Sequence, residues 1–536
     1  MRIGVRLDTC GVYGALLDRG RVLRARSTRA LGDHTADRLP GPRGDRAPLP
    51  ERSHSAAAPH CPPRDRTTPE LTLLRELLTA VPATAHRSAP TAQPARAKSV
   101  TSVTWDISGI LESALTAPSG SRHRAQRVAA VRVLPRVPVA PAGGGHHSPV
   151  ITSLVSRRAV VAGGHDLFGT ELVALEAESV SAAVDELLAG GARAVAVTGT
   201  GAAACSDHEV AVAAELLRRR PDIRVCLSHE AGGLGLLERE AATVLNAALL
   251  EVADRLISQC EEATEALAGS PSCWFVTGDG GRVTGRRLRW SPVTGLAAGI
   301  AAALIGAARL ARVGDAVVAL ADDRALTIGQ VRDGLPHIEA DLVGSNGIRT
   351  SVPQSVTTRI PVHHASAAAQ LATRSRHTSD VVAALRPEGV ELAEALPGQS
   401  EGGPRQVRPD ADITAVGAAM TEPSAWIDLL VPADTPEGLD RHQAEAEQRA
   451  LGLVAAYGAH PGSAYLVRST ATAVGYLRIY RLQVRAGSHG TPDTGTPDTG
   501  SPGAGRGDTG RPAQGAATPD PAAGAARGRG TSGEAR

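Results

Sequence analysis

Apolar residues alternate between two kinds of spacing in the middle of the chain. Residues 178–189 have the spacing of an amphipathic helix, and residues 193–198 form a short, mostly apolar run typical of a buried strand. A second helix is expected from Ser206 to about residue 219, with Ser206 and Glu209 as its capping box. A second strand is expected over residues 223–227. This alternation predicts an α/β architecture.

Other segments continue the pattern on both sides. Residues 2–17 predict a strand, a turn and a strand, and residues 236–260 predict a long helix with one apolar stripe. Residues 299–310 predict a helix of small residues suited to close packing. Further strands are expected at 128–133, 273–277, 316–321, 326–331 and 337–343, and a helix-and-strand ending at 413–420, 440–456 and 477–484.

Changes in composition suggest the domain boundaries. The folded parts expected from the pattern are an N-terminal α/β lobe (1–32 and 99–175), a central α/β domain (176–345) and a C-terminal α/β segment (409–487), and residues 346–408 are expected to be a weakly structured or shortened connection. Residues 33–98 form a low-complexity insert rich in Pro, Arg, His and Ala, with one helical island at 70–80. Residues 488–536 are rich in Gly and Pro, and we expect a disordered tail.

Composition narrows the function classes. The net charge is only +2 and aromatic residues make up 2% of the chain, which argues against nucleic-acid binding. Lys98, the single lysine, has no glycine beside it, so a Walker A loop is excluded.

The first residues resemble no signal peptide, and the apolar run at 295–311 contains Arg309, so we expect a cytoplasmic protein without a membrane span. Cys226 and Cys273 lie in apolar runs and are expected to be buried free thiols.

Several side chains could carry chemistry. His229 and Glu230 stand where a strand ends and a glycine loop begins, so His229 could act as acid or base with Glu230 orienting it. Alternatively, Ser228 and Glu230 only tie the loop to the next helix. Paired histidines at 146–147 and 363–364 lack a second ligand pair at metal spacing, and we expect no metal site.

Two glycine-bearing turns also leave alternatives open. Residues 277–281 could approach a substrate or phosphate, or could form a tight hairpin turn. Gly199, Gly201 and Ala204 match the G-x-G-x-x-A dinucleotide fingerprint, with Glu230 as the candidate ribose acid. That match is weak, because the acid lies farther along the chain than is usual.

Blocks of the sequence resemble the A-type, ATP-dependent chain of the hydantoinase/oxoprolinase family, in the family's order. They are IGVRLDTCGVYGALLD (3–18), residues 194–248 with Ser-His-Glu at 228–230, residues 299–336, residues 396–420 and YLRIYRLQVRAG (476–487). The resemblance implies an actin-like ATPase fold of the sugar-kinase and chaperone-ATPase type, in which two α/β domains close on a nucleotide. It implies ATP and Mg²⁺ as cofactors, a B-type partner subunit, and phosphorylation of a ring carbonyl oxygen to open a cyclic amide such as a hydantoin or 5-oxoproline.

The same resemblance places the nucleotide at particular residues. The first phosphate loop would include Arg6, Asp8 and Thr9, and further contacts would come from Thr277, Asp279, Gly280 and Gly299. His229 and Glu230 would be catalytic.

The chain departs from the family pattern in both phosphate loops. Arg6 stands where the first loop has an acidic residue, and Asp322 and Asp323 stand where the second loop has two glycines. A Gly-Gly-Gly-Ser adenosine loop is replaced by SVTTRIP at 355–361. Carboxylates beside a triphosphate repel it, so we predict impaired nucleotide binding. The sequence leaves three functions open: an ATP-dependent hydrolase subunit, a binding or scaffold subunit that keeps the fold without turnover, or a dinucleotide-binding protein that uses Gly199 and Gly201.

Overall fold

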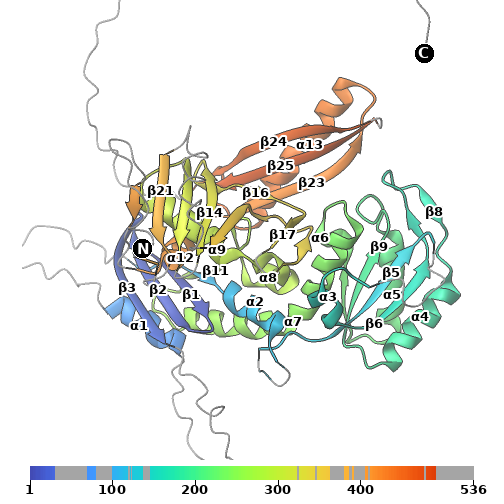
Figure 1. Cartoon of the computed structure of the whole chain (residues 1–536), viewed down its shortest axis with the longest axis horizontal. Coiled ribbons are helices and arrows are strands. Elements are labelled where there is room, and N and C mark those ends of the chain that lie inside the picture. Colours follow the sequence, from blue (N-terminus) through green and yellow to red (C-terminus); the bar gives the residue numbers. More distant parts are fainter. Residues whose placement is uncertain are drawn as a thin grey trace, which may run out of the picture. The chain divides into compact units, whose positions relative to one another are not determined.

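The protein is described by a computed structural model that covers residues 1–29, 69–79, 99–118, 121, 123–136, 145–322, 325–344, 347–361, 379–385, 389–390, 405–407, 411–475 and 478–489. These residues belong to one compact unit, Met1–Pro492, built from helices and mixed β-sheets (Figure 1). The expected α/β class is therefore confirmed. Most of the expected insert at 33–98 lies outside the described residues, as does the expected tail apart from residues 488 and 489.

The first sheet has the strand order β12-β11-β4-β1-β2-β3. Its strands are Arg2–Asp8 (β1), Gly11–Asp18 (β2), Arg21–Arg29 (β3), Ser102–Asp106 (β4), Ser272–Val276 (β11) and Arg282–Val283 (β12). β1, β4 and β11 run parallel, whereas β2, β3 and β12 pair antiparallel with their neighbours. The predicted strand, turn and strand at the start of the chain is confirmed, and β3 and β4 extend it.

Alternate residues of β1 face opposite sides of this sheet. Ile3, Val5 and Leu7 are buried in the largest core. That core also contains residues of helices α1 (Pro69–Thr79), α2 (Ser108–Thr116) and α7 (Leu236–Glu265). Gly4 faces helix α12 (Ile413–Met420), so closely that a Cβ on it would lie 1.8 Å from the carbonyl oxygen of Ala415. The alternation along β1 thus places large apolar side chains on one face of the sheet and leaves the other face open for the close packing of α12.

The second sheet is wholly parallel, with the order β10-β9-β5-β6. Its strands are Val128–Leu134 (β5), Val155–Ala162 (β6), Ala194–Gly199 (β9) and Arg224–Leu227 (β10). Helices α4 (Ala177–Ala189) and α5 (Asp207–Arg219) cover one face, and α7 covers the other. α7 therefore contacts both the first and the second sheet (Figure 1). The helices and strands predicted between residues 178 and 227 are confirmed, with small shifts at their ends.

The third sheet combines segments far apart in the sequence. Its path is β15-β14-β13-β21-β22, with β20 also paired to β14. The strands are Ala316–Ala321 (β13), Ala325–Arg332 (β14), Leu335–Pro336 (β15), Thr357–Pro361 (β20), Ser379–Ala384 (β21) and Arg405–Val407 (β22). The last three lie within residues 346–408, which the sequence predicted to be weakly structured. They take part because parallel pairing of β13, β21 and β22 completes the sheet.

Helix α9 (Ala298–Leu310) packs on the third sheet and against α12, which lies on the first sheet. Glycines allow the closest approach between these two helices. A Cβ on Gly417 would lie 1.7 Å from the carbonyl oxygen of Ala302, and one on Gly306 would lie 2.5 Å from that of Ile413. The prediction of a close-packing helix of small residues near 299–310 is thus confirmed. Its backbone lies directly against that of α12, and this contact connects the third sheet to the first.

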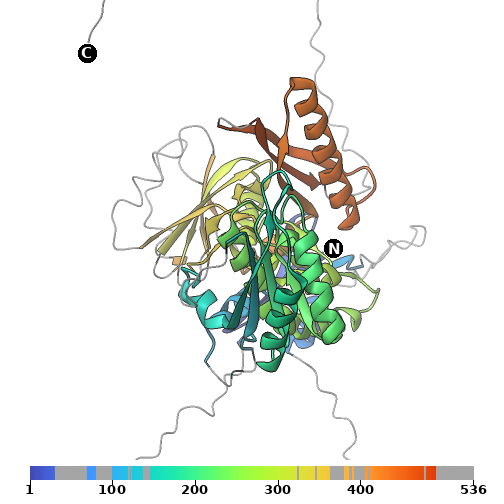
Figure 2. The same ribbon diagram turned by 90° about the vertical axis from the view of Figure 1, so that its right-hand side faces the viewer.

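The C-terminal part is a three-stranded antiparallel sheet, in the order β23-β25-β24, with helix α13 along it (Figure 2). These elements are Ser424–Pro432 (β23), Pro436–Ala456 (α13), Ala464–Val474 (β24) and Ile479–Ser488 (β25). The remaining short elements are α3 (Pro149–Leu154), β7 (Gly164–His165), β8 (Glu171–Val173), α6 (Ser228–Ala231), α8 (Gly285–Trp290), η1 (Pro292–Gly295), β16 (Ile338–Glu339), β17 (Leu342–Val343), β18 (Arg349–Thr350) and β19 (Gln354–Ser355). The single strand predicted at 337–343 is wrong, because this segment is divided into β16 and β17, which belong to two different two-stranded sheets.

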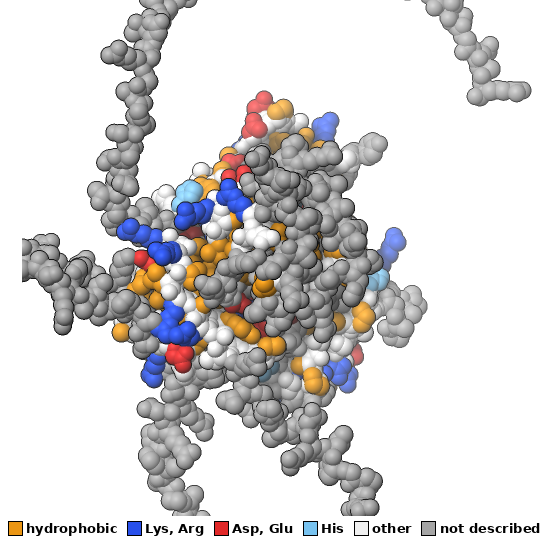
Figure 3. Space-filling model, turned by 60° about the vertical axis from the view of Figure 1, so that its left-hand side comes forward, with side chains coloured by type: hydrophobic (Ala, Val, Ile, Leu, Met, Phe, Trp, Pro, Cys, Tyr) orange, Lys and Arg blue, Asp and Glu red, His pale blue; other side chains and the backbone are white. Residues whose placement is uncertain are grey.

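Two surface features bear on partners. On the face drawn in Figure 3, basic side chains of the described residues stand among apolar and acidic ones rather than in a continuous stripe. Within the part of the chain that the structure describes, none of the helices combines the length and the apolar character needed to cross a membrane.

Candidate functional sites

Three parallel strands of the first sheet end at one edge. β1 ends at Asp8, β4 at Asp106 and β11 at Val276. The first turn of α9 reaches the same place, since the N–H of Gly299 donates to Ser108 Oγ at 3.0 Å. The carboxyl ends of parallel strands are where α/β proteins commonly bind ligands. Four of the residues predicted to bind nucleotide gather at this edge: Arg6, Asp8, Thr9 and Gly299.

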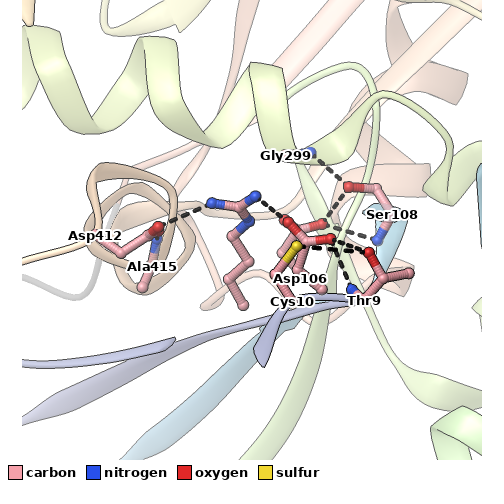
Figure 4. A network of polar contacts seen from close by, with 9 residues as sticks. Thr9, Cys10, Asp106, Ser108, Gly299, Asp412 and Ala415 are labelled. Carbon is pink, nitrogen blue, oxygen red and sulfur yellow. Dashed lines mark hydrogen bonds and ion pairs between the residues drawn. The ribbon is translucent and has the colours of Figure 1, made fainter. Parts of the chain in front are cut away.

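The guanidinium of Arg6 forms ion pairs with two acidic side chains, Asp8 and Asp412, and belongs to the polar network around Asp412, Asp106 and Ser108 that Figure 4 shows. Its Nη1 donates to Asp412 Oδ2 at 2.9 Å, and its Nη2 pairs with Asp8. Its Cζ also lies 5.4 Å from the centre of the Tyr13 ring. Burial acts to lower the pKa of Arg6, but the charges of Asp412, Asp8 and Asp106 together raise it above its ordinary value. Arg6 is therefore a cation held in a fixed orientation by its neighbours.

Asp8 also closes the turn between β1 and β2. Its Oδ1 accepts the main-chain N–H of Thr9 at 2.7 Å and the Thr9 hydroxyl at 3.2 Å. The amide of Thr9, which a phosphate would need as a donor, thus already has a carboxylate acceptor.

Asp106 is a buried carboxyl group that the sequence did not single out. Its Oδ1 accepts the N–H of Ser108 at 3.0 Å and the Ser108 hydroxyl at 2.7 Å. Burial raises the pKa of Asp106, and the two hydrogen bonds from Ser108 oppose that rise. A Cβ on Gly299 would lie 2.9 Å from Asp106 Oδ2, so glycine is needed there to let α9 start against this carboxyl.

The second predicted phosphate loop joins β13 to β14. Asp322 Oδ1 accepts the N–H of Ala325 at 2.6 Å, and Asp322 Oδ2 pairs with Arg359 on β20 at 3.2 Å. Asp323 lies outside the described residues. The carboxylate of Asp322 therefore has a cationic partner in addition to its role in the turn.

Mg²⁺ carrying a triphosphate does not fit the edge of the first sheet as these side chains are arranged. The Arg6 guanidinium occupies the space between Asp8 and Asp412, and the amides of Thr9 and Gly299 already have acceptors. Among the described residues, no three His, Cys, Asp or Glu side chains form a group that could hold a metal ion. A nucleotide would have to displace Arg6 from at least one of its acidic partners.

The other predicted nucleotide contacts lie in the turn between β11 and β12. The Asp279 carboxylate accepts hydrogen bonds from the hydroxyls of Thr277 and Ser424. Gly280 has a φ of +83°, and a Cβ on it would lie 2.6 Å from the Pro336 ring. Because β11 and β12 pair antiparallel, Thr277, Asp279 and Gly280 form the hairpin turn that was one of the two interpretations of this segment.

His229 lies at the carboxyl edge of the second sheet, in the short helix α6 that follows β10. Its Nδ1 lies 2.8 Å from Glu209 Oε2. The hydrogen bond to Glu209 raises the pKa of His229, whereas burial opposes the rise. Glu230 is exposed, and within the described residues no hydrogen bond joins it to His229. The contact that orients His229 thus comes from Glu209, not from Glu230 as the sequence suggested.

Glu209 is fully buried at the start of α5. Its Oε1 accepts the N–H of Gly199 at 2.7 Å and the hydroxyl of Ser228, and its Oε2 accepts the N–H of His229 at 3.1 Å. The Ser206 side chain makes no capping hydrogen bond. The predicted capping box of Ser206 and Glu209 is therefore wrong, because Glu209 turns into the protein toward α6.

The G-x-G-x-x-A loop after β9 has little room for a dinucleotide. The N–H of Gly199 donates to Glu209, and the N–H of Ala202 and of Ala204 donate to main-chain carbonyls of the loop itself. A Cβ on Gly201 would lie 2.2 Å from the carbonyl oxygen of His165. The loop amides that a pyrophosphate would use are thus largely bonded within the protein.

The expectation of buried free thiols at Cys226 and Cys273 is confirmed in part. Cys226 is a buried free thiol, whose pKa burial raises to about 12, and Cys273 is a free thiol that is only partly buried.

Comparison with known proteins places the fold. No protein-family model and no curated protein matches the sequence. Solved structures do match. The nucleotide-free structure of acetone carboxylase, from work on ATP-dependent acetone carboxylation, has a TM-score of 0.59 at 10% identity, covering 91% of this chain and 88% of that one. An ATP-dependent caprolactamase from Pseudomonas jessenii has a TM-score of 0.61 at 13% identity, covering 91% of this chain and 87% of that one. The chain therefore has the fold of the hydantoinase/oxoprolinase family, which both of these structures share.

Proposed function

We propose that this chain is the ATP-dependent subunit of an enzyme that opens a cyclic amide such as a hydantoin or 5-oxoproline, with a B-type subunit as its partner. The observation that carries the proposal is the likeness to an ATP-dependent caprolactamase over nine-tenths of this chain. Helices α9 and α12 pack together between the first and third sheets, and we propose that these two sheets belong to the two lobes of an actin-like arrangement.

The edge formed by β1, β4 and the start of α9 is the proposed nucleotide site. Arg6 weakens binding there, because its guanidinium takes the position between acidic side chains that a divalent cation would need. We further propose that the loop after β13 weakens nucleotide binding, because it has carboxylates where glycine amides would face the phosphates, and Arg359 balances only the charge of Asp322. His229 is the proposed acid or base at the second sheet.

A scaffold role without turnover is the second candidate. It is favoured by one specific feature, the ion pairs of Arg6 with Asp8 and Asp412, which close the first phosphate loop.

A measurement of nucleotide binding distinguishes the two candidate functions. The melting temperature of the purified protein is followed while Mg-ATP is raised from micromolar to millimolar, with Mg-GTP and Mg²⁺ alone as controls. A ligand at 100 times its Kd stabilises a protein by about 2.7 kcal/mol. The hydrolase proposal predicts a rise at millimolar Mg-ATP that is larger with a bound cyclic amide. No rise at millimolar Mg-ATP would reject it in favour of the scaffold.

A further inference from the structure

A buried carboxylate needs donors and a counter-charge, and Glu209 has both. Its two oxygens receive hydrogen bonds from the main-chain N–H of Gly199 and of His229, from the Ser228 hydroxyl and from His229 Nδ1. Arg239, only 2% exposed, lies behind them with its Nε 3.3 Å from Ser228 Oγ. Since an ionised carboxylate only accepts hydrogen bonds, this arrangement assigns the proton on His229 to Nδ1.

The same contacts fix the imidazole ring. Glu209 Oε2 accepts both the main-chain N–H and the ring nitrogen of His229, at 3.1 Å and 2.8 Å, so it holds the residue at two points. The side chain is 27% exposed, and no hydrogen bond from the described residues reaches Nε2. Since Nε2 is not one of the buried side-chain atoms that lack a partner, its lone pair is accessible from outside the protein.

A second histidine–glutamate pair at the same sheet edge shows the contrast. His208 Nδ1 accepts the N–H of Gly164 at 2.8 Å, so its proton is on Nε2, which lies 3.0 Å from Glu171 Oε1. Both ring nitrogens of His208 are thus used inside the protein. His229 has the opposite proton arrangement and keeps one nitrogen free, which is the form needed by a proton acceptor.

We infer that Glu209 is the positioning residue for His229: it holds the proton on Nδ1 and directs Nε2 outward as the proton acceptor. This inference rests on the proposed acid–base role of His229 and replaces Glu230 as its orienting group. Three charged groups act on the imidazole: Glu209 from α5, Glu230 on α6 itself and Arg239 from α7.

The tautomer and pKa of His229 can be measured without substrate or nucleotide. Long-range ¹H–¹⁵N spectra of ¹⁵N-histidine-labelled full-length protein are recorded across pH, and the His229 signals are those lost in His229→Gln. We expect the neutral ring to carry its proton on Nδ1 and to titrate above 6.5. Glu209→Gln should lower the pKa of His229, while the matched Glu171→Gln should leave it unchanged.

Two results would overturn the inference. One is a neutral His229 protonated on Nε2 in the wild-type protein, which can be seen even if Glu209→Gln does not fold. The other is a folded Glu209→Gln protein with an unchanged His229 pKa and tautomer. Neither depends on ATP, so failure of the proposed function in the Mg-ATP titration is a separate result. If the enzyme turns over, Glu209→Gln should also move the acidic limb of the kcat/KM profile with the His229 pKa and leave KM unchanged.

Discussion

Asp412 accepts a hydrogen bond from Arg6, 406 positions earlier in the chain, through Oδ2 at 2.9 Å. Its other oxygen, Oδ1, accepts the N–H of Ala415 at 2.9 Å and so caps α12. One carboxylate therefore fixes the start of α12 and the cation at the end of β1. The closed form of the proposed nucleotide site is thereby connected to the helix that packs against α9.

Asp412→Asn tests this connection. The amide oxygen can still cap α12, but the charge that balances Arg6 is lost. Because both side chains are about nine-tenths buried, we expect a loss of about 1.5–3 kcal/mol in the free energy of unfolding, measured by urea denaturation. Thr435→Ala, at the cap of α13 where no ion pair is involved, should cost only about 1 kcal/mol. An Asp412→Asn protein as stable as wild type would show that the ion pair does not stabilise the fold.

Removing the acidic residues of the second loop should strengthen nucleotide binding. In Asp322→Gly with Asp323→Gly, two charges that repel a triphosphate are gone, so the Kd for Mg-ATP should fall. The matched control is Asp315→Gly with Asp333→Gly, at the other end of β13 and β14, where Asp315 accepts the N–H of Asp333. Calorimetric titration of Mg-ATP into both double variants measures the two Kd values. Equal affinities in the two would mean that repulsion in this loop is not the defect.

Glycine is required where α9 meets α12. Gly417→Ala places a Cβ 1.7 Å from the Ala302 carbonyl oxygen, so the helices must separate, at a cost of about 1–3 kcal/mol or more. Gly452→Ala in α13, whose Cβ would meet nothing within 4 Å, should instead stabilise by about 0.5–1 kcal/mol. Thermal denaturation compares the two, and a Gly417→Ala protein that melts at or above the wild-type temperature would contradict the packing described.

His229 should make stability depend on pH in a defined direction. Its folded-state pKa lies above the ordinary 6.5, because protonated His229 is favoured by Glu209. The stabilisation is therefore fully present below about pH 6.5 and is lost as pH rises through the higher folded-state pKa. The difference in unfolding free energy between wild type and His229→Gln should be largest at the acid end and shrink toward neutral and alkaline pH. A difference that grows with pH would contradict the pairing.

The α/β class and most central elements could be predicted from the sequence, because α4, β9, α5 and β10 each have a clear apolar period. β3 escaped prediction because four arginines interrupt it, and an edge strand can tolerate such exposure. β20, β21 and β22 escaped because their order comes from pairing with distant strands, and no local pattern encodes it.

In the candidate sites, too, some residues could be predicted from the sequence and others could not. Arg6, Asp8, Thr9 and Gly299 were found through the family resemblance and do gather at one sheet edge. Asp106 was missed because a single carboxyl at the end of a short strand has no local motif. Glu209 was assigned to a capping box because it lies three positions after Ser206, and only the fold shows that its side chain turns toward His229. The sequence spacing was the same for either role.

The most direct test of the central claim is a calorimetric titration of Mg-ATP into the wild-type protein and into Arg6→Asp. Arg2→Asp is the control, since Arg2 lies on the same strand and pairs with Glu422 away from the site. If Arg6 blocks the first phosphate loop, wild type and Arg2→Asp should bind Mg-ATP only in the millimolar range, and Arg6→Asp at least tenfold more tightly, about 1.4 kcal/mol. Micromolar, Mg²⁺-dependent binding by the wild-type protein, with no gain in Arg6→Asp, would contradict the account.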